Sequence, residues 1–145
     1  MKISDLLSPT DVMMDVRASQ KGALLQELAA VAAANVGLPV AQVTSHLLKR
    51  EQLGSTGTGN GIAIPHARLP GLKRPHGLLA RLKQGIEFDA IDGQAVDVVF
   101  VLLLPAVESE ALGALALVAR TLRSPETLAR LRAAKTTSEL YAALA

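Results

Sequence analysis

The chain has 145 residues, half of them hydrophobic, with 15 basic and 13 acidic side chains and a formal net charge of +2. This length fits one domain with a sizeable core. The charge excess is small and scattered and only 2% of the residues are aromatic, which argues against a nucleic-acid-binding protein. The absence of cysteine excludes a disulfide framework and a thiolate zinc site.

The N-terminal segment does not have the pattern of a secretory signal peptide. MKISDLLSPTDVMMDVRAS carries acidic residues where a signal peptide needs an apolar core. No apolar run reaches the ~18–20 residues that span a bilayer. We therefore expect a cytoplasmic protein without membrane insertion.

The first third of the chain is expected to be mainly helical. Residues 11–16, DVMMDV, are consistent with a brief strand. Apolar residues then recur at helical spacing, which predicts a helix that is capped by Ser19 and ends at Asn35. A proline opens a second predicted helix over Val40–Leu53, and Gly54 is a suitable C-terminal stop.

The middle of the chain carries the strand signals. GSTGTGNG, residues 54–61, is too rich in glycine for regular structure and indicates a tight surface loop. The run AVDVVFVLLLPA is typical of a central strand buried on both faces. The expected strands are residues 62–64, 78–84 and 95–106, separated by a loop over 68–77 and by a connection over 85–94 with an Asp-Gly hairpin signal.

Helices return in the last third of the chain. They are expected over Glu108–Arg123, Pro125–Ala134 and Thr137–Leu144, with an N-cap offered by Thr137-Ser138-Glu139. This order of helices, strands and helices predicts one domain over residues 1–145, an α/β or α+β layered fold with a small mixed sheet.

The glycine segment and His66 leave two interpretations open. The segment could be a plain turn, with His66 a strand-end residue that bonds to a neighbour. Alternatively, glycine backbone N–H groups and the hydroxyls of Ser55, Thr56 and Thr58 could bind a phosphate or another anion. The spacing matches neither a P-loop nor a dinucleotide fingerprint, so no nucleotide cofactor is expected. A phosphoryl group carried on His66 remains possible, since neutral imidazole is a nucleophile.

The other candidate side chains carry weaker signals. Arg50 precedes the glycine segment, where a guanidinium could pair with phosphoryl oxygens, although arginine is usually a surface residue. His46 is expected mid-helix as a satisfied or surface histidine, and His76 in a solvated loop. No spacing supports a metal site, and no nucleophile elbow or Ser-His-Asp order supports a hydrolase.

The stretch KREQLGSTGTGNGIAIPHA, Lys49 to Ala67, resembles the phosphoryl-accepting segment of bacterial phosphotransferase-system enzyme IIA proteins of the fructose/mannitol class. That class includes the nitrogen-regulatory branch, enzyme IIA-Ntr. Three further stretches are similar to this family: GIEFDAIDGQAVDVVFVLLLPA, ALALVARTLRSPETLARLRAAKT and SELYAAL. The likeness therefore covers nearly the whole chain. It implies a mixed sheet of about five strands flanked by helices on both faces.

The resemblance also implies the roles of individual residues. His66 would accept a phosphoryl group from a small histidine-phosphorylated, HPr-like carrier (NPr), and Arg50 would help to hold that group. Ser55 and Thr56 would line the pocket. The protein would then be a phosphotransferase-system component and phosphohistidine carrier, not a stand-alone turnover enzyme, and would need no cofactor.

One departure from the family pattern leaves the function open. The family usually has a second histidine near the acceptor, and by its spacing from the following leucines that position is Ala111 here. His76 could substitute if its loop folds over. We expect a regulatory carrier of the nitrogen branch that binds targets, such as transporters or sensor kinases, according to its phosphorylation state. The alternatives are a sugar-specific IIA subunit that passes phosphate to a IIB domain and a binding module that is not phosphorylated.

Overall fold

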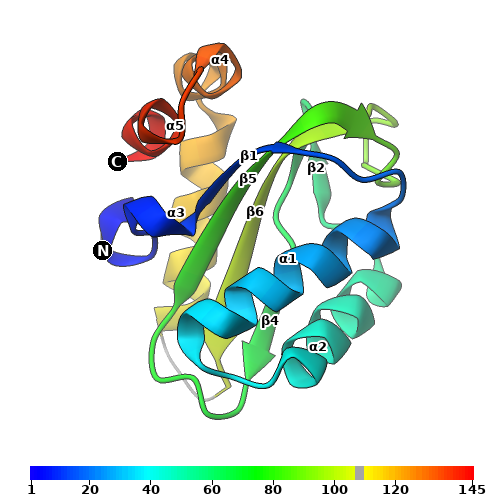
Figure 1. The fold of residues 1–145 in the computed structure, drawn as a ribbon, viewed down its shortest axis with the longest axis vertical. Coiled ribbons are helices and arrows are strands. Elements are labelled where there is room, and N and C mark those ends of the chain that lie inside the picture. Colours follow the sequence, from blue (N-terminus) through cyan, green and yellow to red (C-terminus); the bar gives the residue numbers. More distant parts are fainter. Residues whose placement is uncertain (107–109) are drawn as a thin grey trace.

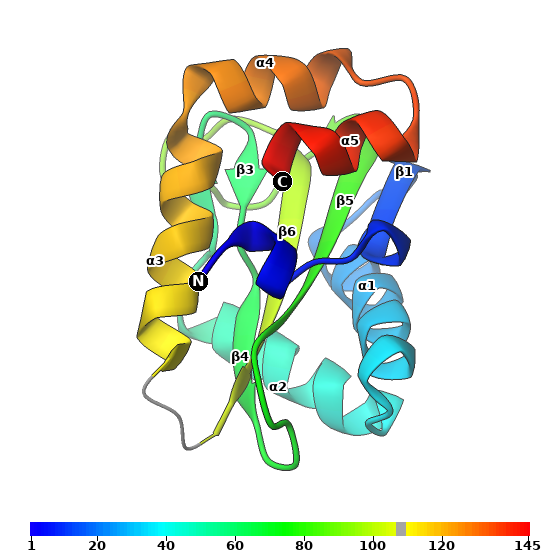
Figure 2. The same cartoon turned by 90° about the vertical axis from the view of Figure 1, so that its left-hand side faces the viewer.

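In the computed structural model, which describes residues 1–106 and 110–145, a six-stranded mixed sheet runs through the middle of the molecule. Helices cover both faces, with α1 and α2 on one side and α3, α4 and α5 on the other (Figures 1 and 2). The strands are β1 (Val12–Val16), β2 (Gly57–Gly59), β3 (Ile62–Ala63), β4 (His66–Leu69), β5 (His76–Ile86) and β6 (Val96–Pro105). The helices are α1 (Lys21–Val36), α2 (Val40–Leu53), α3 (Glu110–Arg123), α4 (Pro125–Ala133) and α5 (Thr137–Leu144), preceded by the 3₁₀ turns η1 (Ile3–Asp5) and η2 (Pro9–Asp11).

Strand β6 is the centre of the sheet and belongs to two cores at once. It pairs antiparallel with β5 and parallel with β3 and β4. Because successive side chains of a strand point to opposite faces, its residues divide between the two helical layers. Val99, Val101 and Leu103 join the core under α1 and α2, and Val98, Phe100, Leu102 and Leu104 join the core under α3, α4 and α5. The prediction of a central strand buried on both faces is confirmed.

Strands β3 and β4 follow one another along the same edge of β6, and Pro65 lies between them. Ile62 pairs with Val98, and His66 pairs with Leu102. Proline has no N–H to donate to the ladder, but its carbonyl accepts from the N–H of Leu102 at 2.8 Å. The chain therefore stays on the sheet through Pro65 and places His66 as the first residue of β4.

The α/β fold class is confirmed, but two predicted loops contain strands. The sheet has six strands rather than about five, because β4 occupies residues partly assigned to the loop over 68–77. The glycine segment is also not a simple loop, because β2 and β3 form a hairpin. Asn60 and Gly61 both have positive φ, as a type I′ turn requires. At Gly57 a Cβ atom would lie 2.8 Å from that of Ala90, so the close approach of the chain requires glycine in this strand.

Helices α2 and α5 have the predicted bounds, whereas α1 and α4 differ from theirs by one or two residues. Helix α1 begins at Lys21, with Gln20 rather than Ser19 at the N-cap, and no side chain caps it. Helix α5 is capped by Thr136, not by the predicted segment 137–139; the hydroxyl of Thr136 accepts the N–H of Glu139 at 3.1 Å. The predicted start of the third helix at residue 108 lies outside the described residues.

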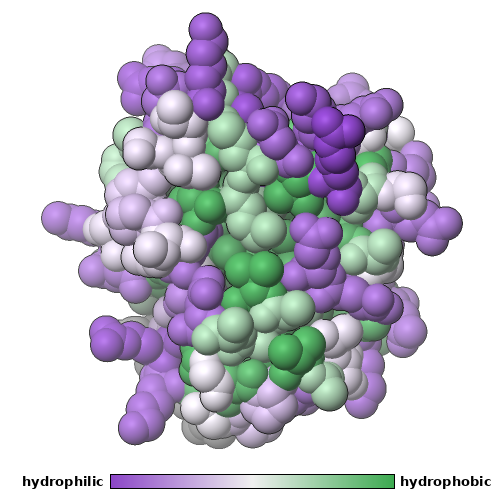
Figure 3. All heavy atoms as spheres, in the orientation of Figure 1, coloured by the Kyte–Doolittle hydropathy of each residue, from purple (hydrophilic) through white to green (hydrophobic). Residues whose placement is uncertain are grey.

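The molecular surface combines polar and apolar regions. Figure 3, in the orientation of Figure 1, shows apolar side chains gathered near the middle of this face, with hydrophilic ones around them. The N- and C-termini both lie on the side of the sheet that carries α3, α4 and α5 (Figure 2). Within the described part of the chain, no helix is both long and apolar enough to cross a bilayer.

Candidate phosphoryl-acceptor site

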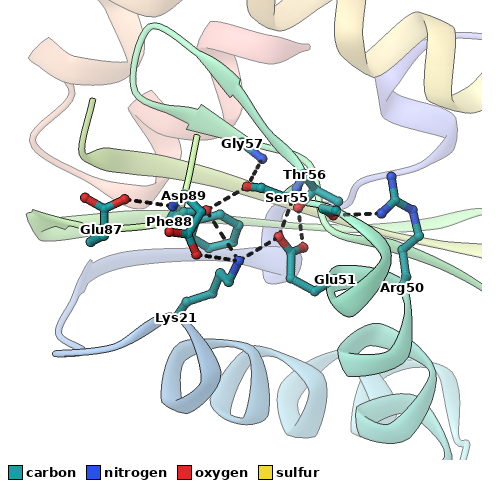
Figure 4. Close-up of polar contacts among 10 residues, drawn as sticks. Lys21, Arg50, Glu51, Ser55, Thr56, Gly57, Glu87, Phe88 and Asp89 are labelled. Atoms are coloured by element: carbon teal, nitrogen blue, oxygen red, sulfur yellow. Dashed lines mark hydrogen bonds and ion pairs between the residues drawn. The ribbon is translucent and has the colours of Figure 1, made fainter. Parts of the chain in front are cut away.

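A buried carboxylate organises the start of the glycine segment. Val43, Leu47 and Glu51 are four residues apart and share the buried face of α2, so Glu51 is only 7% exposed. Its carboxylate accepts the backbone N–H of Thr56 at 2.9 Å and the hydroxyl of Thr56 at 2.6 Å (Figure 4). The end of α2 and the beginning of the glycine segment are thereby held together.

Lys21, at the first turn of α1, neutralises this carboxylate. Its Nζ lies 3.2 Å from Oε2 of Glu51 and 3.4 Å from both the carbonyl oxygen of Phe88 and Oδ2 of Asp89. The same ammonium group lies 5.2 Å from the centroid of the Phe88 ring, within range of a cation–π interaction. Lys21 therefore joins α1, α2 and the connection between β5 and β6 at one point.

The side chain of His66 is half-buried, and one ring nitrogen has a fixed role. Nδ1 lies 2.8 Å from the carbonyl oxygen of Ile64. A carbonyl can only accept, so Nδ1 carries the hydrogen in a neutral ring and Nε2 carries the lone pair. Burial lowers the pKa of His66 below its ordinary value of 6.5, and the charge of Arg50 lowers it further, against the opposing effects of the Ile64 hydrogen bond and Glu51. The neutral, nucleophilic form is therefore favoured near pH 7.

The guanidinium of Arg50 lies at the C-terminal end of α2. Its Nη1 donates to the carbonyl oxygen of Gly54 at 2.9 Å, which uses one of five N–H donors. Figure 4 shows Arg50 and Lys21 on opposite sides of Glu51 and Thr56. Since Arg50 also acts electrostatically on His66, a group bound to the free ring nitrogen would experience its positive charge.

The hydroxyls of Ser55 and Thr56 are engaged within the protein. Ser55 donates to the carbonyl oxygen of Phe88 at 2.6 Å and accepts the N–H of Gly57 at 3.0 Å. Thr56 donates to Glu51 and is buried. Both residues therefore shape the glycine segment in this structure, and direct contact of either hydroxyl with a phosphoryl group stays a prediction.

The remaining histidines lie in different surroundings. His46 in α2 is half-buried, and its Nδ1 lies 2.8 Å from the carbonyl oxygen of Gln42, as expected for a satisfied helical histidine. His76 does not lie in a solvated loop. It is the first residue of β5, and its buried Nε2 lies 3.3 Å from Oδ1 of Asp11. Within residues 1–106 and 110–145, no cluster of three or more histidine or acidic side chains could hold a metal ion.

Ala111 is buried in the core beneath α3 rather than exposed beside a pocket. It is 1% exposed and belongs to the same apolar cluster as Ile62, Ile64 and Leu102. Ala67 and Leu69 belong to the opposite core, so strand alternation directs His66 to the face of the sheet that α3 covers. His66 and Ala111 therefore lie on the same face, but a larger side chain at 111 would have to displace its neighbours.

Sequence reasoning missed Glu51 and Lys21. Glu51 had a local signal, because its spacing from Val43 and Leu47 places a carboxylate on the buried stripe of a helix. Lys21 had no local signal, because its partner Glu51 lies 30 residues away in the sequence. Buried carboxylates are rarely unpaired, so a cation from another element was the missing part of the site.

Comparisons of the whole chain with known proteins point to one family. The family model described as "Phosphoenolpyruvate-dependent sugar phosphotransferase system, EIIA 2" matches residues 5–145. A nitrogen regulatory protein of Bradyrhizobium diazoefficiens is 43% identical over 146 residues, which is 100% of this chain and 95% of the relative. The crystal structure of IIA-Ntr from Neisseria meningitidis superposes with a TM-score of 0.92 at 32% identity over 99% of both chains. IIA mannitol from Escherichia coli, at 18% identity with a TM-score of 0.79 over 95% of this chain and 98% of that one, shares the fold.

Proposed function

Because this chain belongs to the EIIA 2 family of the phosphoenolpyruvate-dependent sugar phosphotransferase system, we propose that it is a phosphoryl carrier with His66 as acceptor. The observation that carries the proposal is the 2.8 Å contact between Nδ1 of His66 and the carbonyl oxygen of Ile64. This contact leaves the lone pair on Nε2, and the lowered pKa of His66 keeps the ring neutral near pH 7.

The proposed reaction moves one phosphoryl group between two histidines. Nε2 of His66 attacks the phosphorus of a phosphohistidine on the donor protein and forms a new P–N bond. The P–N bond of the donor breaks, and its electron pair returns to the donor's imidazole nitrogen. Arg50 contributes a positive charge beside the three phosphoryl oxygens, where a guanidinium stabilises developing negative charge. In this proposal Ser55 and Thr56 shape the glycine segment, which would line the binding site of the phosphoryl group.

The proposed donor is a small HPr-like carrier, NPr, and the proposed role is regulatory. The relative that is 43% identical is a nitrogen regulatory protein, which favours this branch over a sugar-specific one. A phosphoryl group adds nearly two negative charges and three acceptor oxygens, enough to change which proteins dock beside the site. The proposal includes targets such as transporters or sensor kinases and a cytoplasmic site of action.

The test is phosphorylation by a reconstituted donor chain. The protein is incubated with phosphoenolpyruvate, the first enzyme of the system and an HPr-like carrier, and the modified residue is then mapped under alkaline conditions, where phosphohistidine survives. Label on His66 supports the proposal. Absence of label from the folded protein with an active carrier would favour a binding module that is not phosphorylated.

A second arm separates the regulatory role from a sugar-specific one. The phosphorylated protein is mixed with a IIB domain of the fructose or mannitol class, and loss of label from His66 is followed. Retention of the label supports the regulatory proposal. Rapid and complete transfer to the IIB domain would instead show a sugar-specific IIA subunit.

A further inference from the structure

A continuous series of hydrogen bonds connects Glu51 to the imidazole of His66. Glu51 holds Thr56 through its N–H at 2.9 Å and its hydroxyl at 2.6 Å. The carbonyl oxygen of Thr56 accepts the N–H of Ile64 at 3.0 Å. The carbonyl oxygen of Ile64 in turn accepts from Nδ1 of His66 at 2.8 Å. The carboxylate therefore fixes the peptide segment whose carbonyl orients the acceptor ring.

The charge of Glu51 would oppose a phosphoryl group unless it were cancelled. The carboxylate is 7% exposed, so water screens it poorly. Its electrostatic effect reaches His66, where it favours the protonated ring. Lys21 lies 3.2 Å from Oε2 of Glu51 and supplies the cancelling charge. With Glu51 and Lys21 paired, the charge of Arg50 is left to face the phosphoryl group.

We propose that Glu51 and Lys21 form a positioning pair: Glu51 sets the orientation and tautomer of His66 through Thr56 and Ile64, and Lys21 removes the repulsion that this carboxylate would exert on the phosphoryl group. The inference rests on the proposed function of His66 as acceptor. Neither residue contacts the reacting atoms. Their effect is transmitted by the backbone of Thr56 and Ile64 and by the local electrostatic field.

The two members of the pair are tested by variants with opposite electrostatic effects. Glu51→Gln keeps the size of the side chain but removes its charge and replaces one acceptor oxygen with an NH₂ group, so the charge-assisted hydrogen bonds to Thr56 and Lys21 are lost. Lys21→Met keeps the length of the stem and leaves Glu51 uncancelled. Lys21→Arg retains the positive charge as a rescue variant. Glu27→Gln, an exposed position on α1, is the matched control.

Two measurements are made on each folded variant. Nitrogen-15 NMR of the unphosphorylated protein reports the tautomer and the pKa of His66 without any phosphoryl donor, and the labelling assay reports the rate of transfer. Glu51→Gln is expected to reduce the Nδ1–H population, to lower the pKa of His66 and to slow transfer by about tenfold, the loss of one charge-assisted hydrogen bond. Lys21→Met is expected to raise the pKa of His66 and to slow transfer several-fold, whereas Lys21→Arg and Glu27→Gln stay near wild type.

A purely structural role predicts a different result. In that case Glu51→Gln lowers the unfolding midpoint but leaves the tautomer, the pKa of His66 and the transfer rate within about twofold of wild type, which would overturn the inference. If Glu51→Gln does not fold, Thr56→Val tests the inference in its place. This variant removes only the hydroxyl bond to Glu51 and is expected to shift the same NMR signals of His66. If wild-type protein takes no label, the proposed function fails, whereas the NMR result still decides whether Glu51 orients His66.

Discussion

His66 and His76 each begin a strand of the same sheet, and both side chains are half-buried. They differ in which ring nitrogen is held and by what. Nδ1 of His66 donates to the neutral carbonyl of Ile64, which leaves Nε2 with its lone pair. Nε2 of His76 lies 3.3 Å from the carboxylate of Asp11 and makes no hydrogen bond of good geometry. The carbonyl of Ile64 holds Nδ1 of His66 and leaves its Nε2 able to react, whereas the carboxylate of Asp11 lies beside Nε2 of His76 and would repel a phosphoryl group that approached this nitrogen.

The two histidines also belong to different polar networks. Asp11 is 3% exposed and accepts from the N–H of Ser8 at 2.9 Å, the hydroxyl of Ser8 at 2.8 Å and the amide of Asn35 at 2.9 Å. That network joins η2 to α1 and carries no arginine. The network of Glu51 lies next to Arg50 in α2. Similar buried carboxylates can therefore serve stability at one site and, as we propose, phosphoryl transfer at the other.

The largest expected effect comes from removing the acceptor. His66→Ala is expected to abolish labelling by the carrier, because no nucleophilic nitrogen remains at the site, whereas His76→Ala and His46→Ala retain it. The measurement is incorporation of radioactive phosphate at equal concentrations of folded protein. Label that persists in His66→Ala and disappears in His76→Ala would show that His76, and not His66, is the acceptor.

Removing the guanidinium of Arg50 tests whether this neighbouring cation makes His66, rather than His76, the acceptor. Arg50→Ala is expected to slow phosphorylation about ten- to a hundredfold, the equivalent of roughly 1.5–3 kcal/mol for a charge-assisted hydrogen bond. Lys49→Ala is the matched control, because Lys49 is the exposed neighbour on the same helix. Equal rates in Arg50→Ala and Lys49→Ala would show that Arg50 does not bind the phosphoryl group.

The Asp11 network is expected to affect stability and not transfer. Asp11→Ala leaves the donors of Ser8 and Asn35 without their acceptor, so the free energy of unfolding should fall by about 2 kcal/mol. Urea denaturation measures this change, and Asp5→Ala, at an exposed position, is the control. A folded Asp11→Ala protein that phosphorylates at a tenth of the wild-type rate would show that this network also serves the site.

Ala111 tests whether α3 has room for a second histidine on the face that His66 shares. The family pattern predicts that Ala111→His speeds transfer if the pocket has room, but Ala111 is 1% exposed. We expect the free energy of unfolding to fall by about 1 kcal/mol, since overpacking a filled core is destabilising, without a gain in rate. Ala111→Leu controls for bulk. Faster transfer in the histidine variant alone would show that the ring reaches the site.

The smallest effect is the dependence of stability on pH. Because the pKa of folded His66 is lowered, the unfolded chain takes up a proton first as the pH falls below about 6.5. The contribution of His66 to stability is therefore complete above about pH 6.5 and is lost as the pH falls toward the folded pKa. The measurement is the difference in unfolding free energy between wild type and His66→Gln from about pH 8 to 5. A difference that stays constant through this range would contradict the lowered pKa.

Much of the fold follows from local signals in the sequence. The apolar run of β6 indicated a strand buried on both faces, and helical periodicity placed α1, α2 and α4 to within two residues. His66 and Arg50 were selected from a glycine segment, a proline and a family resemblance, and the chain's membership in that family is confirmed. Each of these signals is contained in a short stretch, because turn preferences and side-chain periodicity act between near neighbours.

The contacts that distinguish the two histidines depend on the tertiary structure alone. Lys21 meets Glu51 only because α1 packs beside α2 on one face of the sheet. His76 meets Asp11 only because β1, which follows η2, pairs with β5. Strand β4 was not predicted for the same reason, since its four residues form a strand by pairing with β6. A residue's own neighbours in sequence do not specify which distant element will supply its counter-charge or hydrogen-bond partner, because packing of the two cores against the sheet decides that choice.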